Sequence, residues 1–223
     1  MSDDVILEAR AVTRRYGSGR AVIDALDLSV RRGEIVAIIG RSGSGKSTLL
    51  NLVGQMDRPD AGRLIYAGQD TAGWDDDQRT RFRRSMLGFV FQAYNLLPTL
   101  TVRENIALPL ELNGLPLEPT VTRLLEALDI DALGERYPEQ VSGGEQQRTA
   151  VARALAHRPP LVIADEPTGN LDADTGHEVI ALFERAVREA GAALLMATHS
   201  TEMIGHADRV LALDHGRLAP VAP

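Results

Sequence analysis

Four short, unbroken apolar runs limit the folds that this chain can adopt. They cover residues 35–39, 87–91, 161–164 and 192–197. Runs of this length without polar alternation are typical of strands that are buried on both faces of a parallel sheet. Helix-like stretches lie between them, in the order expected for successive β–α units. The pattern therefore predicts an α/β fold built on a parallel core.

Each run is followed by a glycine or by polar residues. These residues are Gly40, Gln92, Asp165 with Glu166, and Thr198 with His199. In open α/β sheets, ligands bind at the carboxyl ends of the strands. We therefore expect these residues to surround one shared pocket.

The segment 93–157 has a different character from the rest of the chain. Helical patterns cover residues 103–112, 120–128 and 143–156, and the prolines at 109, 116, 119 and 138 punctuate them. We interpret it as a helical subdomain that is inserted into the α/β core.

The two ends of the chain have strand character. Residues 5–30 show short alternating runs, which predict an antiparallel sheet, and residues 210–218 predict a small hairpin. The expected organisation is a single domain over 1–223. Its α/β core, including the antiparallel part, would comprise residues 1–92 and 158–223.

Composition excludes several classes of site. The 223 residues carry a net charge of −7, which argues against broad nucleic-acid binding because that function favours a basic face. The absence of cysteine removes disulfides and thiolate metal sites. We expect no signal peptide, since the first residues have no cationic segment followed by an apolar one. No apolar stretch approaches 18 residues, so any role in a membrane would require another subunit.

A glycine-rich motif follows the first apolar run. Its residues are Gly40, Arg41, Ser42, Gly43, Ser44, Gly45, Lys46, Ser47 and Thr48. The pattern matches a nucleotide phosphate loop, in which glycines let backbone N–H groups converge on phosphate oxygens. Lys46 would reach the β- and γ-phosphates, and the Ser47 hydroxyl would bind Mg²⁺. A plain glycine-rich turn is the alternative, but the apolar run before the motif and the apolar helix pattern after it favour the phosphate loop.

Two adjacent carboxylates, Asp165 and Glu166, end the third run. Successive strand side chains point in opposite directions, so the pair can serve two purposes. Asp165 is the candidate on the metal side, and Glu166 is the candidate base for an attacking water. The alternative is an acidic turn before Pro167.

A second glycine motif, Val141-Ser-Gly-Gly-Glu-Gln-Gln-Arg148, lies about a hundred residues after the first. Ser142 and Glu145 have the spacing of a helix capping box. A cap alone does not need Gly143 and Gly144, each of which costs about 1 kcal/mol in a helix relative to alanine. Exposed backbone N–H groups for an anion would need them. The motif therefore predicts a second anion site, which invites a partner chain, and this role is compatible with capping.

Together these motifs resemble those of the ATP-binding cassette (ABC) ATPases, in the same order. The resemblance runs from Tyr16 to Leu218. It implies a P-loop NTPase core of the RecA-like type, with an antiparallel β subdomain and a helical signature subdomain over 93–157. The wording of residues 88–98 and 167–172 resembles the lipoprotein-release and macrolide-export branch.

The resemblance also implies individual roles. Tyr16 would stack on adenine and Val22 would flank it, with ATP and Mg²⁺ as the cofactors. Gln92 would sense and bind Mg²⁺, and His199 would contact the γ-phosphate, so both join Lys46 and Glu166 in the catalytic set. Asp172 would lie at a dimer interface. The trans contact to the ATP of the opposite protomer would come from Ser142, Gly143, Gly144 and Glu145.

The implied function is an ATP-hydrolysing subunit of an ABC transporter. Two copies would close head to tail on ATP and drive a separate membrane permease, contacted near residues 92–100 and the helical insertion. The protein would lie on the cytoplasmic face of the cell membrane and would export or extract a lipophilic or lipoprotein-like substrate. One alternative is an ABC ATPase of a cell-division or regulatory membrane complex that transports nothing. A third possibility is a soluble ABC ATPase of DNA repair or translation. Proteins of that class usually carry coiled coils, zinc modules or tandem cassettes, and this sequence has none of them. We therefore expect no nucleic-acid partner.

Overall fold

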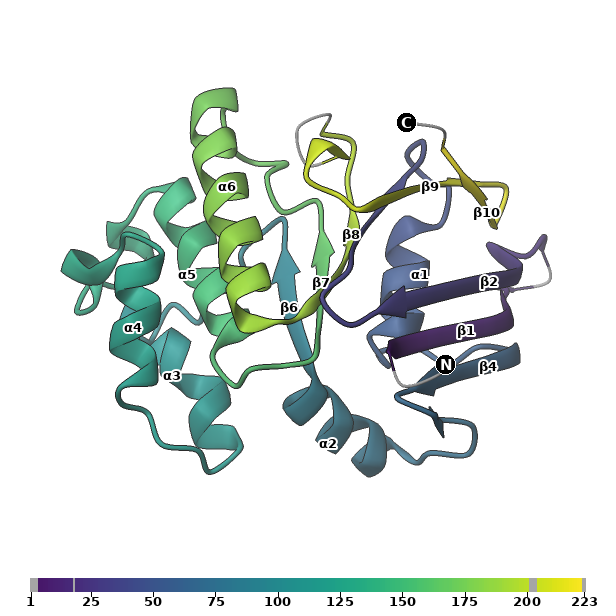
Figure 1. The fold of residues 1–223 in the computed structure, drawn as a ribbon, viewed down its shortest axis with the longest axis horizontal. Coiled ribbons are helices and arrows are strands. Elements are labelled where there is room, and N and C mark those ends of the chain that lie inside the picture. Colours follow the sequence, from purple (N-terminus) through teal and green to yellow (C-terminus); the bar gives the residue numbers. More distant parts are fainter. Residues whose placement is uncertain (1–3, 18, 201–203, 222–223) are drawn as a thin grey trace.

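Two β-sheets and a separate group of helices make up the chain (Figure 1). The computed structural model describes residues 4–17, 19–200 and 204–221, so the outermost residues of the predicted domain lie outside the described part. The central sheet has the strand order β10-β9-β3-β8-β7-β6. Its strands are β3 (Ile35–Ile39), β6 (Leu87–Phe91), β7 (Leu161–Asp165), β8 (Ala193–Ala197), β9 (Arg209–Asp214) and β10 (Arg217–Pro220).

The four apolar runs form neighbouring parallel strands, as predicted. β3 pairs with β8, β8 with β7, and β7 with β6, all in parallel register. The predicted hairpin at the end of the chain is also confirmed, because β10 pairs antiparallel with β9. The sequence did not indicate that β9 extends the parallel sheet beside β3.

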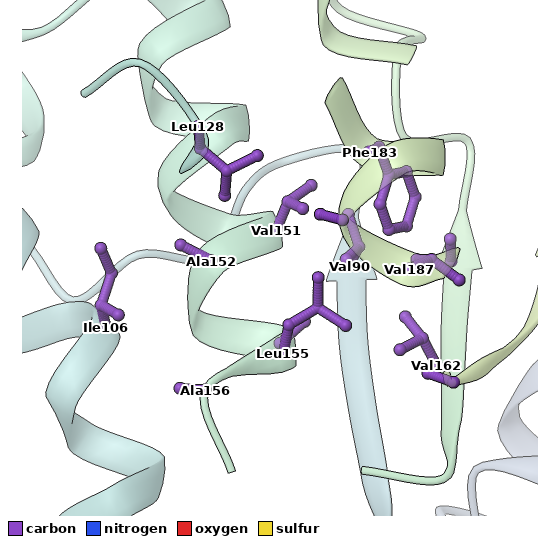
Figure 2. Packing of buried hydrophobic residues seen from close by; sticks show 14 of the residues in the cluster. Val90, Ile106, Leu128, Val151, Ala152, Leu155, Ala156, Val162, Phe183 and Val187 are labelled. Atoms are coloured by element: carbon purple, nitrogen blue, oxygen red, sulfur yellow. The ribbon is translucent and has the colours of Figure 1, made fainter. Parts of the chain in front are cut away.

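Both faces of the central sheet are buried around β3, β6, β7 and β8, and the residues of these strands alternate between two hydrophobic clusters. In β7, Leu161 and Ile163 join the cluster that includes the helix α1 (Lys46–Val53). Val162 and Ala164 join the cluster on the opposite face. Figure 2 shows this second cluster, in which Val90 and Val162 of the sheet lie among side chains of two helices. The alternation places Asp165, the next residue of the strand, on the face that α1 covers.

Most helices lie beyond the β6 edge of the sheet or on the face opposite α1 (Figure 1). The helical stretches predicted within 93–157 are confirmed, and α5 packs against β6, α3 and α6. Among the described residues, no helix combines the length and apolar character needed to cross a membrane. The remaining helices are α2 (Asp76–Met86), α3 (Val102–Leu112), α4 (Thr120–Ala127), η1 (Asp131–Leu133), η2 (Pro138–Gln140), α5 (Gly143–Leu155) and α6 (Ala173–Ala190).

The second sheet is antiparallel and lies beside α1, with strand order β2-β1-β4-β5. The sheet predicted for residues 5–30 is thereby confirmed. The two additional strands were not predicted from the sequence. The strands are β1 (Val5–Arg14), β2 (Ile23–Arg31), β4 (Ala61–Tyr66) and β5 (Gln69–Asp70).

Candidate functional site

A cleft of about 650 Å³ opens at the carboxyl ends of the parallel strands. Every residue of the predicted phosphate loop except Ser44 lines it. The other lining residues are Val22, Gln92, Asp165, Glu166 and His199. The expected shared pocket is present, because β3, β6, β7 and β8 each deliver a polar segment to this one edge. Thr198 is the exception among the residues expected there, since it is buried and does not line the cleft.

The loop between β3 and α1 has a backbone that requires glycine at defined positions. Gly43 and Gly45 have positive φ angles of 78° and 107°. At Gly40, an added Cβ would lie 2.6 Å from the Leu213 carbonyl oxygen. No side chain caps the N-terminus of α1. The loop therefore forms a concave cradle at the positive end of a helix, which suits a phosphate group.

Lys46 lies at the first position of α1, and its side chain folds back over this loop. Its Nζ donates hydrogen bonds to the carbonyl oxygens of Gly40, at 2.8 Å, and Arg41, at 3.5 Å. Lys46 is the single lysine of the chain, because the 24 basic residues comprise one lysine and 23 arginines. An ammonium group is a compact, flexible point charge, and it can exchange these carbonyls for phosphate oxygens by a small rotation.

Asp165 lies deep in the cleft, beside the first turn of α1. Burial raises the pKa of Asp165, and the charge of Glu166 adds to this effect. A hydrogen bond with the Ser47 side chain and the charge of Lys46 act in the opposite direction. Ser47 and Asp165 thus bring a hydroxyl and a carboxylate together, which is the oxygen donor set that Mg²⁺ prefers. The residues present fit that ion.

Glu166 and His199 form a pair at the mouth of the cleft. Glu166 Oε2 lies 2.7 Å from His199 Nδ1 and accepts a hydrogen bond from the His199 backbone N–H at 3.3 Å. The Glu166 side chain is 18% exposed, whereas that of His199 is 74% exposed. The φ angle of Glu166 is +47°, so the backbone turns sharply after β7. This turn presents the carboxylate beside Asp165 instead of on the opposite face.

Gln92 is joined to a residue that sequence reasoning missed. Its Nε2 donates to Asn170 Oδ1 at 3.0 Å, and Asn170 Nδ2 donates to the Gln92 carbonyl oxygen at 2.9 Å. A Cβ at Gly169 would lie 2.8 Å from Gln92 Nε2. Asn170 lies within residues 167–172, which carry part of the family resemblance, but nothing in the sequence pointed to Gln92 as its partner.

Tyr16 does not line the cleft in the described structure. Its ring is half exposed and lies under the Arg14 guanidinium, 4.8 Å from the ring centre. The Tyr16 hydroxyl donates a hydrogen bond to Asp57 at 2.8 Å. The structure therefore does not bring Tyr16 to the phosphate cradle, whereas Val22 is placed there.

The second glycine motif begins α5, on the other side of the sheet from α1 (Figure 1). The predicted capping box is confirmed. Glu145 N donates to Ser142 Oγ at 3.3 Å, and Ser142 N donates to Glu145 Oε2 at 2.7 Å. The backbone hydrogen bond from Ser142 lowers the pKa of Glu145. Within the described residues, none of this motif lines the cleft that contains Lys46.

Both glycines of this motif are packed closely by neighbouring side chains. A Cβ at Gly143 would lie 2.9 Å from the Tyr94 hydroxyl, and one at Gly144 would lie 2.5 Å from Thr175 Cγ2. The first turn of α5 is therefore held between the loop after β6 and the start of α6. Small residues are needed here for packing within one chain, whatever else the motif binds.

Gly144→Ala is expected to lower the free energy of unfolding by about 1–3 kcal/mol, because the new methyl group overpacks the contact with Thr175. Adding Thr175→Ser removes Cγ2 and should recover most of the loss. Urea denaturation of the single and double variants measures both effects. Gly205→Ala is the matched control, since no atom lies within 4 Å of its added Cβ. A double variant as unstable as Gly144→Ala alone would contradict this account.

Asp172 caps α6, and its carboxylate accepts a hydrogen bond from Thr175 N at 3.0 Å. It lines a smaller recess of about 290 Å³, which shares Glu166 and His199 with the main cleft. Asp172 thus lies at the rim of the site, next to the Glu166–His199 pair.

Comparisons with known proteins agree on one family. A family model described as ABC transporter matches residues 23–169. The lipoprotein-releasing system ATP-binding protein LolD of Maricaulis maris is 46% identical over 226 residues, covering 99% of each chain. An uncharacterized ABC transporter ATP-binding protein of Mycobacterium tuberculosis is 48% identical over 204 residues, covering 90% of this chain and 82% of the relative.

Solved structures give the same result. The ATP-binding cassette MJ0796, in a dimeric post-hydrolysis state bound to ADP and Pi, has a TM-score of 0.87 and 34% identity, covering 98% of this chain and 100% of that one. A second dimeric structure of MJ0796 gives a TM-score of 0.86 and 36% identity over the same shares. The predicted fold class, a P-loop NTPase core with antiparallel and helical parts, is confirmed by these neighbours.

Proposed function

The chain belongs to the ABC transporter family, and from this premise we propose that it is an ATP-hydrolysing subunit that works as a homodimer on a membrane permease. One observation carries the proposal. The cleft gathers Lys46, Ser47, Asp165, Glu166 and His199, while the second glycine motif lies elsewhere on the same chain. We assign residues 1–92 and 158–223 to the nucleotide-binding core and 93–157 to the signature subdomain.

We assign the triphosphate to the cradle between β3 and α1. Backbone N–H groups of residues 40–48 and the Lys46 ammonium would bind its oxygens. Ser47, Asp165 and Gln92 would hold Mg²⁺, which neutralises charge on the β- and γ-phosphate oxygens when it is bound. Val22 would flank adenine. Tyr16 would have to leave its contact with Asp57 in order to stack on adenine.

Glu166 is the proposed base. Its carboxylate lies at the mouth of the cleft, and it would orient a water molecule and accept its proton. His199 holds this carboxylate through Nδ1 and the backbone N–H. The contact with His199 therefore fixes the orientation of the Glu166 carboxylate. We also assign to His199 a contact with the γ-phosphate, which would lie beside this carboxylate. Gln92, held by Asn170, completes the same side of the site.

We assign the second glycine motif to the triphosphate held by the other copy. In a head-to-tail dimer, Ser142, Gly143, Gly144 and Glu145 of one protomer would complete the cleft of its partner, with Asp172 at the interface. The dimeric cassettes of MJ0796 support this arrangement by analogy. Such a composite site makes hydrolysis depend on pairing.

Mixing two inactive variants tests the composite site. Glu166→Gln removes the base but leaves ATP in the cradle, and Ser142→Asp keeps a good helix cap while adding a negative charge against phosphate. A mixed dimer has one site in which both parts are intact. An equimolar mixture should therefore recover about a quarter of wild-type ATPase activity, since half of the dimers are mixed and each has one working site. If the mixture remains as inactive as its components, the head-to-tail assignment is wrong.

The permease contact is assigned to an apolar groove between α2, β6 and α3. Its volume is about 640 Å³, and its lining includes Met56, Leu97 and Leu112, which are 42–55% exposed. Arg83 and Arg84 also line it. A partner segment with an apolar face and an acidic flank would complement this groove. Through that contact the protein would lie on the cytoplasmic face of the membrane.

The relatives named as lipoprotein-releasing system proteins support a cargo of lipoprotein-like or other lipophilic character, moved by export or extraction. The alternative remains a membrane complex of cell division or regulation that transports no cargo. Reconstitution with the permease separates the two, because only the first predicts ATP-dependent release of a lipidated substrate from vesicles.

A further inference from the structure

We propose that Arg153 is a positioning residue that joins the nucleotide cleft of one protomer to the glycine motif that the same protomer offers to its partner. The inference rests on the function proposed above. It concerns a link within one chain, between the loop that follows Gln92 and the start of α5.

The loop after Gln92 has an unusual backbone. Tyr94 and Asn95 are consecutive non-glycine residues with positive φ angles of 60° and 50°. Such conformations are costly for residues with a Cβ and persist only where surrounding contacts impose them. Arg153, on α5, provides those contacts. Its Nη2 donates to the Tyr94 carbonyl oxygen at 2.8 Å, and its Nη1 donates to the Asn95 carbonyl oxygen at 2.6 Å.

Arg153 also lines the groove assigned to the permease, but among the described residues no acidic side chain pairs with it. Burial lowers its pKa, and within the described part of the chain no acidic group offsets that effect. A guanidinium presents two donors in a fixed plane, so it can hold two successive carbonyl groups at once. Loss of this side chain would leave both carbonyls of a strained turn without their partner.

The rest of the loop is attached to the helices as well. Asn105, which is fully buried on α3, donates to the carbonyl oxygens of Leu97, Leu100 and Thr101. Its Oδ1 accepts a hydrogen bond from Leu97 N at 2.9 Å. The loop from Tyr94 onward is therefore tied to α3 and α5, whereas Gln92 itself is tied to Asn170 and lines the cleft.

Close packing completes the connection to the glycine motif. The Tyr94 hydroxyl lies against Gly143, and Thr175 of α6 lies against Gly144. Packed contacts of this kind transmit small displacements because the interior does not compress. A shift of Gln92 on nucleotide binding would thus move Tyr94, which is attached to α5 at both ends: its hydroxyl packs against Gly143 in the first turn, and its carbonyl is held by Arg153 in the last turn. In this way the state of one site would set the position of the motif that completes the other site.

The test uses Arg153→Met in the full chain, in two backgrounds. In the Glu166→Gln background, which should retain the ATP-bound dimer, the dimer dissociation constant is expected to rise by about tenfold or more. In the otherwise wild-type chain, the Hill coefficient for ATP should fall to about one. The affinity of the monomer for ATP should stay within about twofold, because the cradle is not altered. A purely structural role would lower the melting temperature but leave the Hill coefficient unchanged.

Arg185→Met is the matched control, because it also removes an arginine–carbonyl hydrogen bond from a helix, that to Ala127 at 3.0 Å, but outside this chain of contacts. If Arg153→Met, like Arg185→Met, keeps the dimer dissociation constant and the Hill coefficient of its parent, the proposal is overturned. Should Arg153→Met fail to fold, Arg153→Lys decides the question, since lysine keeps the positive charge but lacks the two planar donors that hold both carbonyl groups. Dimerisation of Arg153→Lys within about twofold of its parent then overturns the proposal. If Glu166→Gln alone never dimerises with ATP, the proposed function is itself wrong, and this inference falls with it.

Discussion

Glu166→Gln is expected to reduce ATP turnover by about 10²–10⁴-fold, because it removes a general base while preserving size and shape. The amide oxygen can still accept the backbone hydrogen bond from His199, so the cleft should keep its geometry. ATP binding should persist. The variant should therefore accumulate as an ATP-bound dimer, which light scattering and single-turnover phosphate release can detect together.

Glu178→Gln is the control for this change, since Glu178 is an exposed carboxyl on α6 that does not line the cleft. It should turn over like the wild type. Wild-type turnover by Glu166→Gln would remove Glu166 from its assigned role and leave Asp165 as the remaining carboxylate of the cleft. Loss of ATP binding would show instead that Glu166 is needed to form the site.

Lys46→Ala is expected to lower kcat/KM for ATP by about 10²–10³-fold, because it deletes a cation aimed at oxygens that gain charge during phosphoryl transfer. Structural damage should be slight, since the Nζ atom contacts only loop carbonyls in the described structure. Steady-state ATPase assays and equilibrium binding of a fluorescent ATP analogue measure the two components. A melting temperature close to that of the wild type would show that the loss is electrostatic.

Arg41→Ala tests whether the effect of Lys46→Ala comes from the position of the Lys46 ammonium or only from the loss of one positive charge in the loop. Arg41 belongs to the same loop, but its side chain is exposed. Its removal should change kcat/KM by less than about threefold if the loop binds phosphate there through its backbone. Equal losses from Arg41→Ala and Lys46→Ala would mean that only the net charge of the loop matters. The specific assignment of Lys46 would then fail.

Much of the core and of the cleft could be predicted from local sequence. The strands β3, β6, β7 and β8 are continuous apolar runs because both of their faces are buried, and such runs stand out from any neighbouring pattern. The polar residues that follow them are brought together by the parallel direction of the strands alone. For the same reason the cleft could be inferred before any distance was known.

The missed features depend on contacts between distant segments or on weak local patterns. β4 buries only Leu64 and Tyr66 fully, so its pattern is too short to indicate a strand. β9 looks like half of a hairpin, and only the tertiary fold brings it beside β3. Arg153 is, in sequence, one more cation on a helix. Its two carbonyl partners lie 58 and 59 residues earlier in the chain.

The position of the only lysine has a practical chemical consequence. Apart from the α-amino group of Met1, an amine-selective acylating reagent has a single nucleophile to modify in the whole polypeptide, and that nucleophile lies in the phosphate cradle. One covalent adduct would thus serve as a footprint of the cleft. A bound nucleotide would protect Lys46 from acylation. The mass of one tryptic peptide would then report whether the cleft is occupied, in an extract as readily as in a purified sample.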